Sequence, residues 1–386
     1  MKRTAAAVAV GIVLAGTAAV VWRGSDEETQ ARPELQRLLD GLVSGPGRVA
    51  PGATAYVIGP RGSWSGAAGV ANVRTREPMR ADARMRLLSV SKLWTAVLIL
   101  RLVEKDEIGL DDTVGALYPG LLPRGARITL RQLLNNTSGL IDDNDISSDP
   151  RRYLDQVSDP GLRAELLLAG ERLAGDPEYE VPTRLMIRFA AALPLLSEPG
   201  TAYHYSNIGY QLAGLLAERA TGESLAALFQ REIVEPLSLE NAAYDPRSRI
   251  TGPHAHGYRL SSDGKLTDTT GRVADLGANG GVVSNARDEA HFLVALMGGR
   301  LLGRAQLAAL KTPSPHQPYG LGTSIEPTGC AGTGYTHGGA GAGFATRVYV
   351  SGDGRRVAVL FLNARTPGGY GDELAERTAL QLFCAA

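Results

Sequence analysis

The sequence predicts an α/β fold of the α+β kind: an antiparallel sheet formed by both chain ends, flanked by helices, with a mainly helical lobe inserted between them. Two hairpins and a helical middle predict it. The first hairpin begins at Gly52, where an apolar strand, a Pro-Arg-Gly turn and a strand of small residues follow one another. The second spans 343–364, and its strands meet at "SGDG". Between them, roughly over 92–312, the apolar spacing is mostly helical.

Shorter signals place the remaining elements. The run "ARMRLL" (83–88) resembles a strand that leads into a helix beginning at Ser89. Another helix is capped by Ser284 or Asn285 and stopped by a glycine pair. Apolar residues recur at helical spacing in four segments, which are 92–110, 208–222, 284–299 and 371–386.

Length and charge limit the functions to consider. With 386 residues, the chain is long enough for about two structural lobes. Its hydrophobic fraction of 44% and charged fraction of 21% are typical of a globular protein with an ample core. The formal net charge is zero, which argues against a nucleic-acid partner. No residue pattern calls for a metal or another cofactor.

The N-terminus is predicted to be a targeting segment. Lys2 and Arg3 precede an uncharged stretch, Ala5 to Trp22, that is rich in Ala and Val. A basic start followed by an apolar run indicates export. Residues 1–32 therefore fit either a cleaved signal peptide or an uncleaved membrane anchor, which would be the protein's only membrane contact. We expect the domain that follows, 33–386, to lie outside the cytoplasm, either secreted or at the outer face of the cell membrane.

Two cysteines, Cys330 and Cys384, lie near the end of the chain. An oxidising compartment would favour a disulfide between them. Closing that loop would contribute roughly 3–4 kcal/mol in the chain-entropy description. Two buried free thiols are the alternative.

The segment "LLSVSKLW" (87–94) places a lysine in an apolar run. Only five residues of this chain are lysines, against 40 lysines and arginines together. Arginine stays protonated in proteins, whereas a desolvated lysine can lose its proton and act as a base. Residues three apart share a helix face, so Lys92 is expected beside Ser89 and not beside Ser91. Free N–H groups at the start of a helix also favour an oxyanion there. A lysine that lies along the surface is the alternative.

Two further motifs follow in order. "YSN" places Tyr205 and Asn207 just before a helix, and "HGG" places His337 and Gly339 on a predicted strand. With "SVSK", these segments resemble the three signatures of the serine β-lactamase and penicillin-binding protein superfamily. The likeness is greatest to the branch of class C β-lactamases, D-alanyl-D-alanine carboxypeptidases and related esterases. It extends to "ITLRQLLNNTSGL", "GGVVSNARDEAHF" and "YGLG", and thus runs from about residue 35 to the end.

The resemblance implies a β-lactamase/transpeptidase-like fold and acyl transfer through a covalent intermediate. Ser89 would be the nucleophile, and Lys92 and Tyr205 would share the role of base. Asn207 would bind the amide carbonyl of the substrate and orient Lys92. His337 would face Tyr205 across the cleft. Gly339 would let the substrate approach, and the N–H groups of Ser89 and Ala340 would form the oxyanion hole.

Each downstream role has a structural alternative. Tyr205 is one of 13 tyrosines and could serve only in packing. Asn207 could cap the helix that follows it. His337 could be a buried histidine whose hydrogen bonds are satisfied. The acidic segment "DDNDISSD" (142–149) lacks the Gly and Glu of a calcium loop and is predicted to be a solvated loop.

One departure from the family pattern bears on the substrate. Carboxypeptidases of this branch often carry threonines around the glycine of the third motif, where this chain has Gly338 and Ala340. Arg347 is a candidate replacement for binding a terminal carboxylate. The Glu-x-x-Leu-Asn pattern of class A β-lactamases is also missing from the sequence.

We therefore expect an exported serine hydrolase that acts on D-alanyl peptides or β-lactams, small-molecule or peptide substrates, with no cofactor. An esterase or amidase on the same scaffold is the alternative. A sensor that binds penicillin or peptidoglycan with little turnover is a further one.

Overall fold

The computed structural model describes most of the chain. The described residues are 31–45, 47–143, 145, 151–175, 181–246, 250–261, 263–271, 276–365 and 373–386. The predicted signal or anchor, 1–32, lies outside them except for its last two residues. Among the described residues, none of the helices combines the length and the apolar character needed to cross a membrane.

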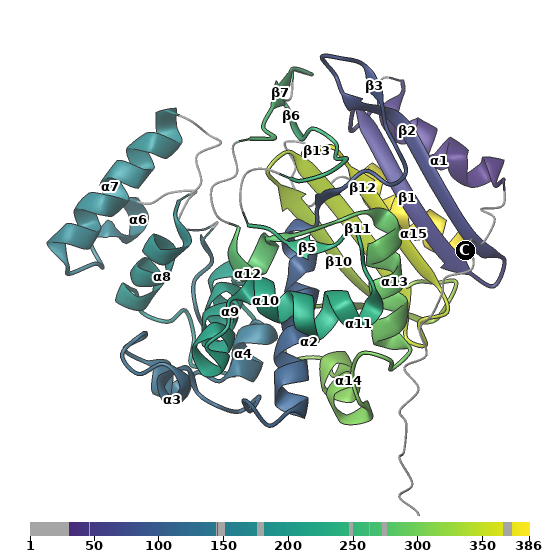
Figure 1. Ribbon diagram of the computed structural model, residues 1–386. Coiled ribbons are helices and arrows are strands. Elements are labelled where there is room, and N and C mark those ends of the chain that lie inside the picture. The colour runs from purple at the N-terminus through teal and green to yellow at the C-terminus, as the bar shows by residue number, and fades with distance from the viewer. Residues whose placement is uncertain are drawn as a thin grey trace, which may run out of the picture.

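A seven-stranded sheet forms the centre of the molecule, in the order β3-β2-β1-β12-β11-β10-β9 (Figure 1). Its strands are β1 Gly52–Gly59, β2 Gly62–Asn72, β3 Glu77–Pro78, β9 Ser324–Pro327, β10 Thr333–Gly341, β11 Phe344–Ser351 and β12 Val357–Leu362. All neighbouring pairs are antiparallel. Strand β1 pairs directly with β12, Ala53 opposite Leu362, so the sheet is built from both ends of the chain as predicted.

The predicted hairpins are present. In the first, Gly59 pairs with Gly62 across the turn Pro60-Arg61. In the second, β11 pairs with β12 along its length. A third hairpin, formed by β10 and β11, was not predicted from the sequence. Its turn residues Ala342 and Gly343 both have positive φ, 47° and 80°, which suits the tight turn between antiparallel strands.

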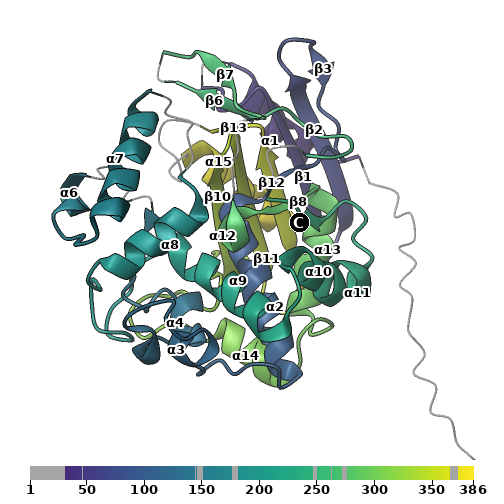
Figure 2. The same ribbon diagram turned by 60° about the vertical axis from the view of Figure 1, so that its left-hand side comes forward.

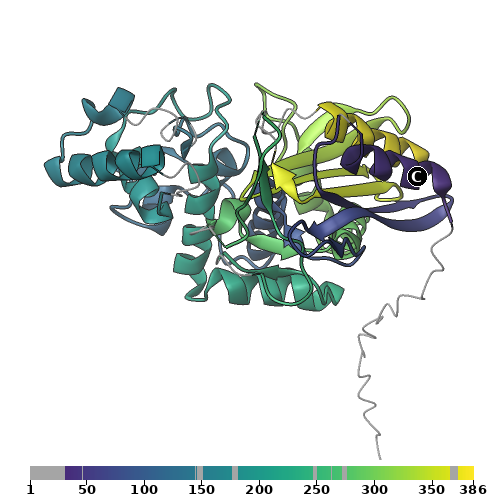
Figure 3. The ribbon, with the colours of Figure 1, turned by 90° about the horizontal axis from the view of Figure 1, so that it is seen from above.

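Helices cover both faces of the sheet (Figure 3). One face carries α1 Pro33–Val43 and α15 Glu373–Ala385, and the other carries α2 Ser91–Glu104 and α13 Ala286–Met297. Alternate side chains of β12 enter the two layers, so this strand is apolar throughout. Val357, Val359 and Phe361 face α2 and α13, while Ala358, Leu360 and Leu362 face α1 and α15.

The helical lobe lies beside the sheet, and its α6 and α7 extend farthest from it (Figures 1 and 2). Its helices are α3 Val114–Leu117, α4 Leu130–Leu134, α6 Arg151–Leu154, α7 Pro160–Gly175, α8 Thr183–Ala192, α9 Asn207–Thr221, α10 Leu225–Phe229, α11 Glu235–Leu237, α12 Gly277–Gly280 and α14 Arg304–Lys311. The sequence did not predict two further small sheets. One consists of β4 Met85–Arg86, β8 Val282–Ser284 and β5 Ala243–Tyr244. The other consists of β13 Ala364–Arg365, β6 Tyr258–Leu260 and β7 Leu266–Asp268. Strands of two or three residues are too short to show an alternating pattern.

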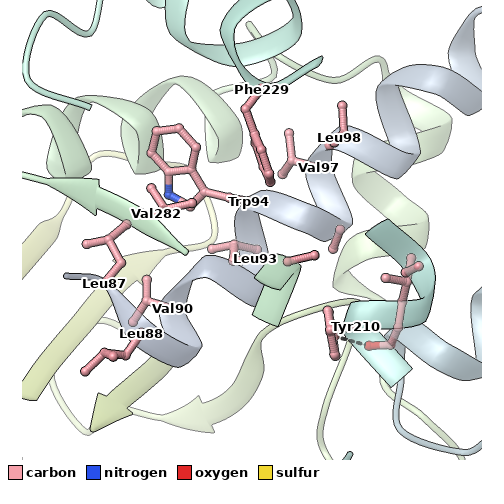
Figure 4. Close-up of a cluster of buried hydrophobic side chains, with 14 of the residues drawn as sticks. Leu87, Leu88, Val90, Leu93, Trp94, Val97, Leu98, Tyr210, Phe229 and Val282 are labelled. Atoms are coloured by element: carbon pink, nitrogen blue, oxygen red, sulfur yellow. Dashed lines mark hydrogen bonds between the residues drawn. The ribbon is translucent and has the colours of Figure 1, made fainter. Parts of the chain in front are cut away.

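Helix α2 runs through the main hydrophobic core of the molecule. Most of its residues are fully buried, so it has no polar face. Trp94 stacks on Phe292 at 4.3 Å between ring centroids. It also lies beside Phe229 (Figure 4). Tyr210 of α9 donates a hydrogen bond to the Leu134 carbonyl in the same region. A helix packed on all sides holds the residues at its N-terminus in a fixed position.

The predicted disulfide is present between Cys330 and Cys384. It joins the loop between β9 and β10 to α15.

Candidate active site

Ser89 lies on a single turn of 3₁₀ helix, Leu88–Val90, directly before α2. The strand that precedes it is only Met85–Arg86, shorter than predicted. Leu88 adopts a left-handed backbone, with φ 52°, which costs about 1–3 kcal/mol for a residue of this kind. The packed core below Leu88 and α2 holds this strained turn, which presents Ser89 beside β10.

The hydroxyl of Ser89 receives two hydrogen bonds. Lys92 Nζ donates to Ser89 Oγ at 3.0 Å, and Tyr205 OH donates to the same atom at 3.1 Å. The spacing of three residues therefore brings Ser89 and Lys92 together as expected. Ser91 points elsewhere, because its Oγ accepts from the Val282 N–H at 3.1 Å.

Lys92 is completely buried. Its ammonium also donates to Asn207 Oδ1 at 2.5 Å and to the Asn279 carbonyl at 3.3 Å, and lies 4.9 Å from the ring centre of Tyr205. Burial lowers the pKa of Lys92 to about 7, against the opposing charges of Asp142 and Asp143. At that pKa, a substantial fraction of the amine is free to accept a proton near neutral pH.

Asn207 is the first residue of α9, but it does not cap the helix. The cap is Ser206, whose Oγ accepts from the Gly209 N–H at 3.2 Å. The side chain of Asn207 instead bridges Lys92 and Asp143, since its Nδ2 donates to Asp143 Oδ1 at 2.7 Å. Its backbone N–H donates to Asp142 Oδ1 at 2.9 Å.

The start of the acidic segment 142–149 is not a solvated loop, so this prediction was wrong for its first two residues. Asp142 is 8% exposed, and both Asp142 and Asp143 bind Asn207. Burial and the charge of Asp142 raise the pKa of Asp143 to about 7. Of the other residues in this segment, only Asp145 is among those described.

His337 lies on β10 and is buried. Its hydrogen bonds go to Tyr319 and Gly338, and its implied place opposite Tyr205 stays a prediction. Nδ1 is 2.8 Å from the Gly338 carbonyl, which can only accept, so Nδ1 carries the hydrogen. Nε2 therefore accepts from Tyr319 OH at 3.2 Å. Burial and the nearby charge of Lys92 lower the pKa of His337 to about 3, which keeps it neutral.

Strand β10 passes directly beside Ser89. A Cβ on Gly339 would lie 2.3 Å from the Leu87 carbonyl oxygen and 3.1 Å from the Ser89 nitrogen. The glycine is thus required for the close approach of two backbone segments of the protein itself. The turn pairs Gly341 with Phe344, and antiparallel strands alternate their hydrogen-bonded pairs, so the N–H of Ala340 points away from β11. It is on the strand edge that β9 leaves uncovered, since β9 pairs only as far as Thr336.

Arg347 is not available to bind a substrate carboxylate, and that suggestion was wrong. Its Nε donates to Glu376 Oε2 of α15 at 2.5 Å. Within β11, it has the same parity as Tyr349, which packs in the layer of α1 and α15. It therefore lies on the face of the sheet opposite Ser89.

Sequence reasoning missed two residues of this site. Tyr319 belongs to "YGLG", which was noted as a family-like segment without a role. Asp143 lies three residues after another such segment, 128–140, but was considered only as part of a calcium-like segment. Neither residue stands at a fixed spacing from Ser89, so no local pattern could join them to it.

The arrangement provides the parts of an acyl-transfer site. A hydroxyl sits between an amine with a lowered pKa and a phenol, and the N–H of Ala340 on the neighbouring strand points away from β11.

Comparison with known proteins agrees with this geometry. A family model described as "Beta-lactamase" matches residues 35–383. The structure of a D-stereospecific amidohydrolase from Streptomyces sp. superposes with a TM-score of 0.73 at 27% identity, covering 92% of this chain and 100% of that chain.

Two curated proteins give partial matches. A D-aminopeptidase of Brucella anthropi is 28% identical over 311 residues, 79% of this chain and 54% of that protein. Esterase EstB of Burkholderia gladioli is 30% identical over 183 residues, 46% of this chain and 43% of that protein. The matched parts thus span about half the length of these two relatives.

Proposed function

The chain belongs to the β-lactamase family of serine hydrolases, and from this premise we propose that it hydrolyses small acyl compounds through an acyl-enzyme at Ser89. One observation carries the proposal: Ser89 Oγ is bound by both Lys92 Nζ and Tyr205 OH, at 3.0 and 3.1 Å. A serine in contact with a base and a second proton carrier is the arrangement that nucleophilic catalysis needs.

In the proposed reaction, Ser89 Oγ attacks the acyl carbonyl carbon as its proton passes to the neutral amine of Lys92. The carbonyl oxygen becomes an oxyanion between the N–H groups of Ser89 and Ala340. The bond to the leaving group breaks, and Tyr205 or Lys92 gives that group a proton. Water then attacks the ester carbonyl carbon while the same pair accepts its proton, the bond to Ser89 Oγ breaks, and the proton returns to Oγ as the acid leaves. His337 takes no part in the proton transfer, because both of its ring nitrogens are in hydrogen bonds, with Tyr319 and Gly338.

D-Alanyl peptides and β-lactams are one proposed class of acyl donor, in a carboxypeptidase-like or β-lactamase-like reaction. The D-specific relatives named above support a D-configured acyl group. An amidase or esterase reaction, on donors without a terminal carboxylate, is the second class. A specific observation favours it: Gly338 and Ala340 offer no hydroxyl, and Arg347 is bound to Glu376 behind the sheet.

The test is intact mass spectrometry over time after adding benzylpenicillin, D-alanine amide or a short-chain aryl ester. We expect a transient or persistent adduct of the acyl mass on the wild type and none on the Ser89→Ala variant. Consumption of the amide or the ester with no response to penicillin would select the second class. Equal turnover by Ser89→Ala would refute the proposal.

We also propose that the protein is exported. Export rests on the N-terminal sequence, and it predicts activity outside the cytoplasm. A sensor would form the adduct at Ser89 but release it far more slowly than an enzyme, so the lifetime of the adduct separates the two.

A further inference from the structure

A continuous chain of hydrogen bonds leads from Ser89 into the helical lobe. Ser89 Oγ accepts from Lys92 Nζ at 3.0 Å, Asn207 Oδ1 accepts from the same amine at 2.5 Å, and Asp143 Oδ1 accepts from Asn207 Nδ2 at 2.7 Å. The reaction described above uses Lys92 as the base and gives no role to Asp143.

The orientation of the Asn207 amide decides whether Lys92 is held. An ammonium can only donate, so it needs Oδ1. Above its pKa of about 7, Asp143 is an ionised carboxylate, which can only accept and so needs Nδ2. Asp143 therefore selects the one orientation in which Oδ1 faces Lys92. Asp142 accepts a hydrogen bond from the backbone N–H of Asn207 at 2.9 Å. The backbone and the side chain of Asn207 are therefore both bound by the acidic pair Asp142 and Asp143.

The charge on Asp143 acts on the same amine. Lys92 is fully buried, and the negative charges of Asp142 and Asp143 oppose the desolvation that drives off its proton. Among the described residues, the groups around Lys92 that can carry or exchange a proton are Ser89, Asp142, Asp143, Tyr205, Tyr210 and His337. His337 is neutral, and its weak basicity sets it apart from the acidic pair.

We propose that Asp143 is a positioning residue for the reaction at Ser89: it orients Asn207 so that the amide holds Lys92 against the serine, and its charge sets the pH at which Lys92 can take the serine proton. This inference rests on the proposed function, in which Lys92 is the base.

Two variants separate orientation from charge. Asp143→Asn keeps an acceptor for Asn207 Nδ2 but removes the charge, while Asp143→Ala removes both. Asp111→Asn is the matched control, because it removes one carboxylate of the same lobe that pairs with Arg131 at the surface.

The first measurement is the pH titration of Lys92 by NMR on lysine-labelled protein, identified as the signal that Lys92→Arg removes. The chain has only five lysines, so the spectrum is simple. In the wild type we expect a midpoint near the pKa of about 7. Without the negative charge the ammonium is less stable, so the midpoint should fall by about one pH unit in Asp143→Asn and stay unchanged in Asp111→Asn. An unchanged midpoint in Asp143→Asn would overturn the inference.

The second measurement is the pH profile of the acylation rate of Ser89, with benzylpenicillin and a short-chain aryl ester as probes. The neutral amine is the active form, so a lower midpoint moves the acid limb of the profile to lower pH in Asp143→Asn. Asp143→Ala should lose about tenfold or more in rate at every pH, because its amide is no longer oriented. A wild-type rate in Asp143→Ala would overturn the positioning role. If the Lys92 midpoint moves but Ser89 is never acylated, the proposed function fails while the coupling of Asp143 to Lys92 stands.

Discussion

Gly339 shows how a single methyl group can disturb the site. Its missing Cβ allows β10 to lie against the turn that carries Ser89, and the nearest atom there, the Leu87 carbonyl oxygen, is a backbone atom that cannot rotate away. We expect Gly339→Ala to push the strand and the turn apart and to lower the acylation rate of Ser89 by about 100-fold, the effect of losing an oxyanion donor. Acylation kinetics with an aryl ester measure it.

Gly338→Ala is the control for this prediction. A Cβ there would meet the guanidinium of Arg347, 2.6 Å away and on the opposite face of the sheet. This variant should lose stability without losing acylation rate once folded. Equal losses of acylation rate in both variants would show that the approach of β10 to Ser89 is not the cause.

The choice of lysine at position 92 has a physical explanation at the same scale. The chain uses arginine far more often than lysine, yet the fully buried cation beside Ser89 is a lysine. An arginine would stay charged and could not take a proton from the serine. The bonds from Lys92 to Ser89, Asn207 and the Asn279 carbonyl offset part of the cost of burial.

At the scale of elements, α15 is held to the sheet by more than packing. Arg32 and Arg356 donate to the carbonyls of Ala385 and Ala386, at 2.5 and 2.8 Å, where the helix dipole favours cations. The disulfide joins Cys384 near the end of the same helix to Cys330.

Removing that disulfide should lower stability without abolishing the site. The replacement of Cys330 and Cys384 by serine is expected to cost about 3–4 kcal/mol, as the unfolded chain regains the freedom of the loop. For a chain of this length, this corresponds to a fall in Tm of about 5 °C, measured by calorimetry with and without reductant. Acylation of Ser89 should continue below the new Tm, and a wild-type Tm would contradict the prediction.

At the scale of the molecule, one hydrophobic cluster joins the two lobes. It contains Val359 and Phe361 of the sheet, Trp94 of α2, and Phe229 and Leu216 of the helical lobe. The sheet in turn needs both chain ends, because β1 pairs with β12. The helical lobe shares this core with the sheet, whereas a second core, between the sheet and α1 and α15, belongs to the sheet lobe. We propose that 33–386 is one folding unit with the helical lobe inserted at about 92–312.

A single cooperative transition follows from this. Urea unfolding observed through Trp94, between the lobes, should give the same midpoint as unfolding observed through Trp64 in β2, each in a variant whose other tryptophans are phenylalanine. Far-ultraviolet circular dichroism should agree with both. An earlier transition at Trp94 than at Trp64 would show that the helical lobe unfolds by itself.

Local patterns in the chain were enough to predict the sheet at both ends, the long helices, and the contact of Ser89 with Lys92. These features depend on spacings of two, three or four residues, which backbone geometry converts directly into a shared face. Order along the chain also brought Tyr205, Asn207 and His337 into one hypothesis through a family resemblance. The disulfide was predictable because only two cysteines exist.

Tertiary packing alone decided what each distant side chain touches. It brought His337 into hydrogen-bonding distance of Tyr319, and Asp143 into hydrogen-bonding distance of Asn207. It also placed Arg347 on the far face of the sheet, where it binds Glu376. Such contacts depend on strand parity and on how loops from separate elements meet, where a shift of one residue or a few ångströms changes the partner. The sequence carries no local signal of these choices, so the groups that set the proton affinity of Lys92 became visible only in the folded structure.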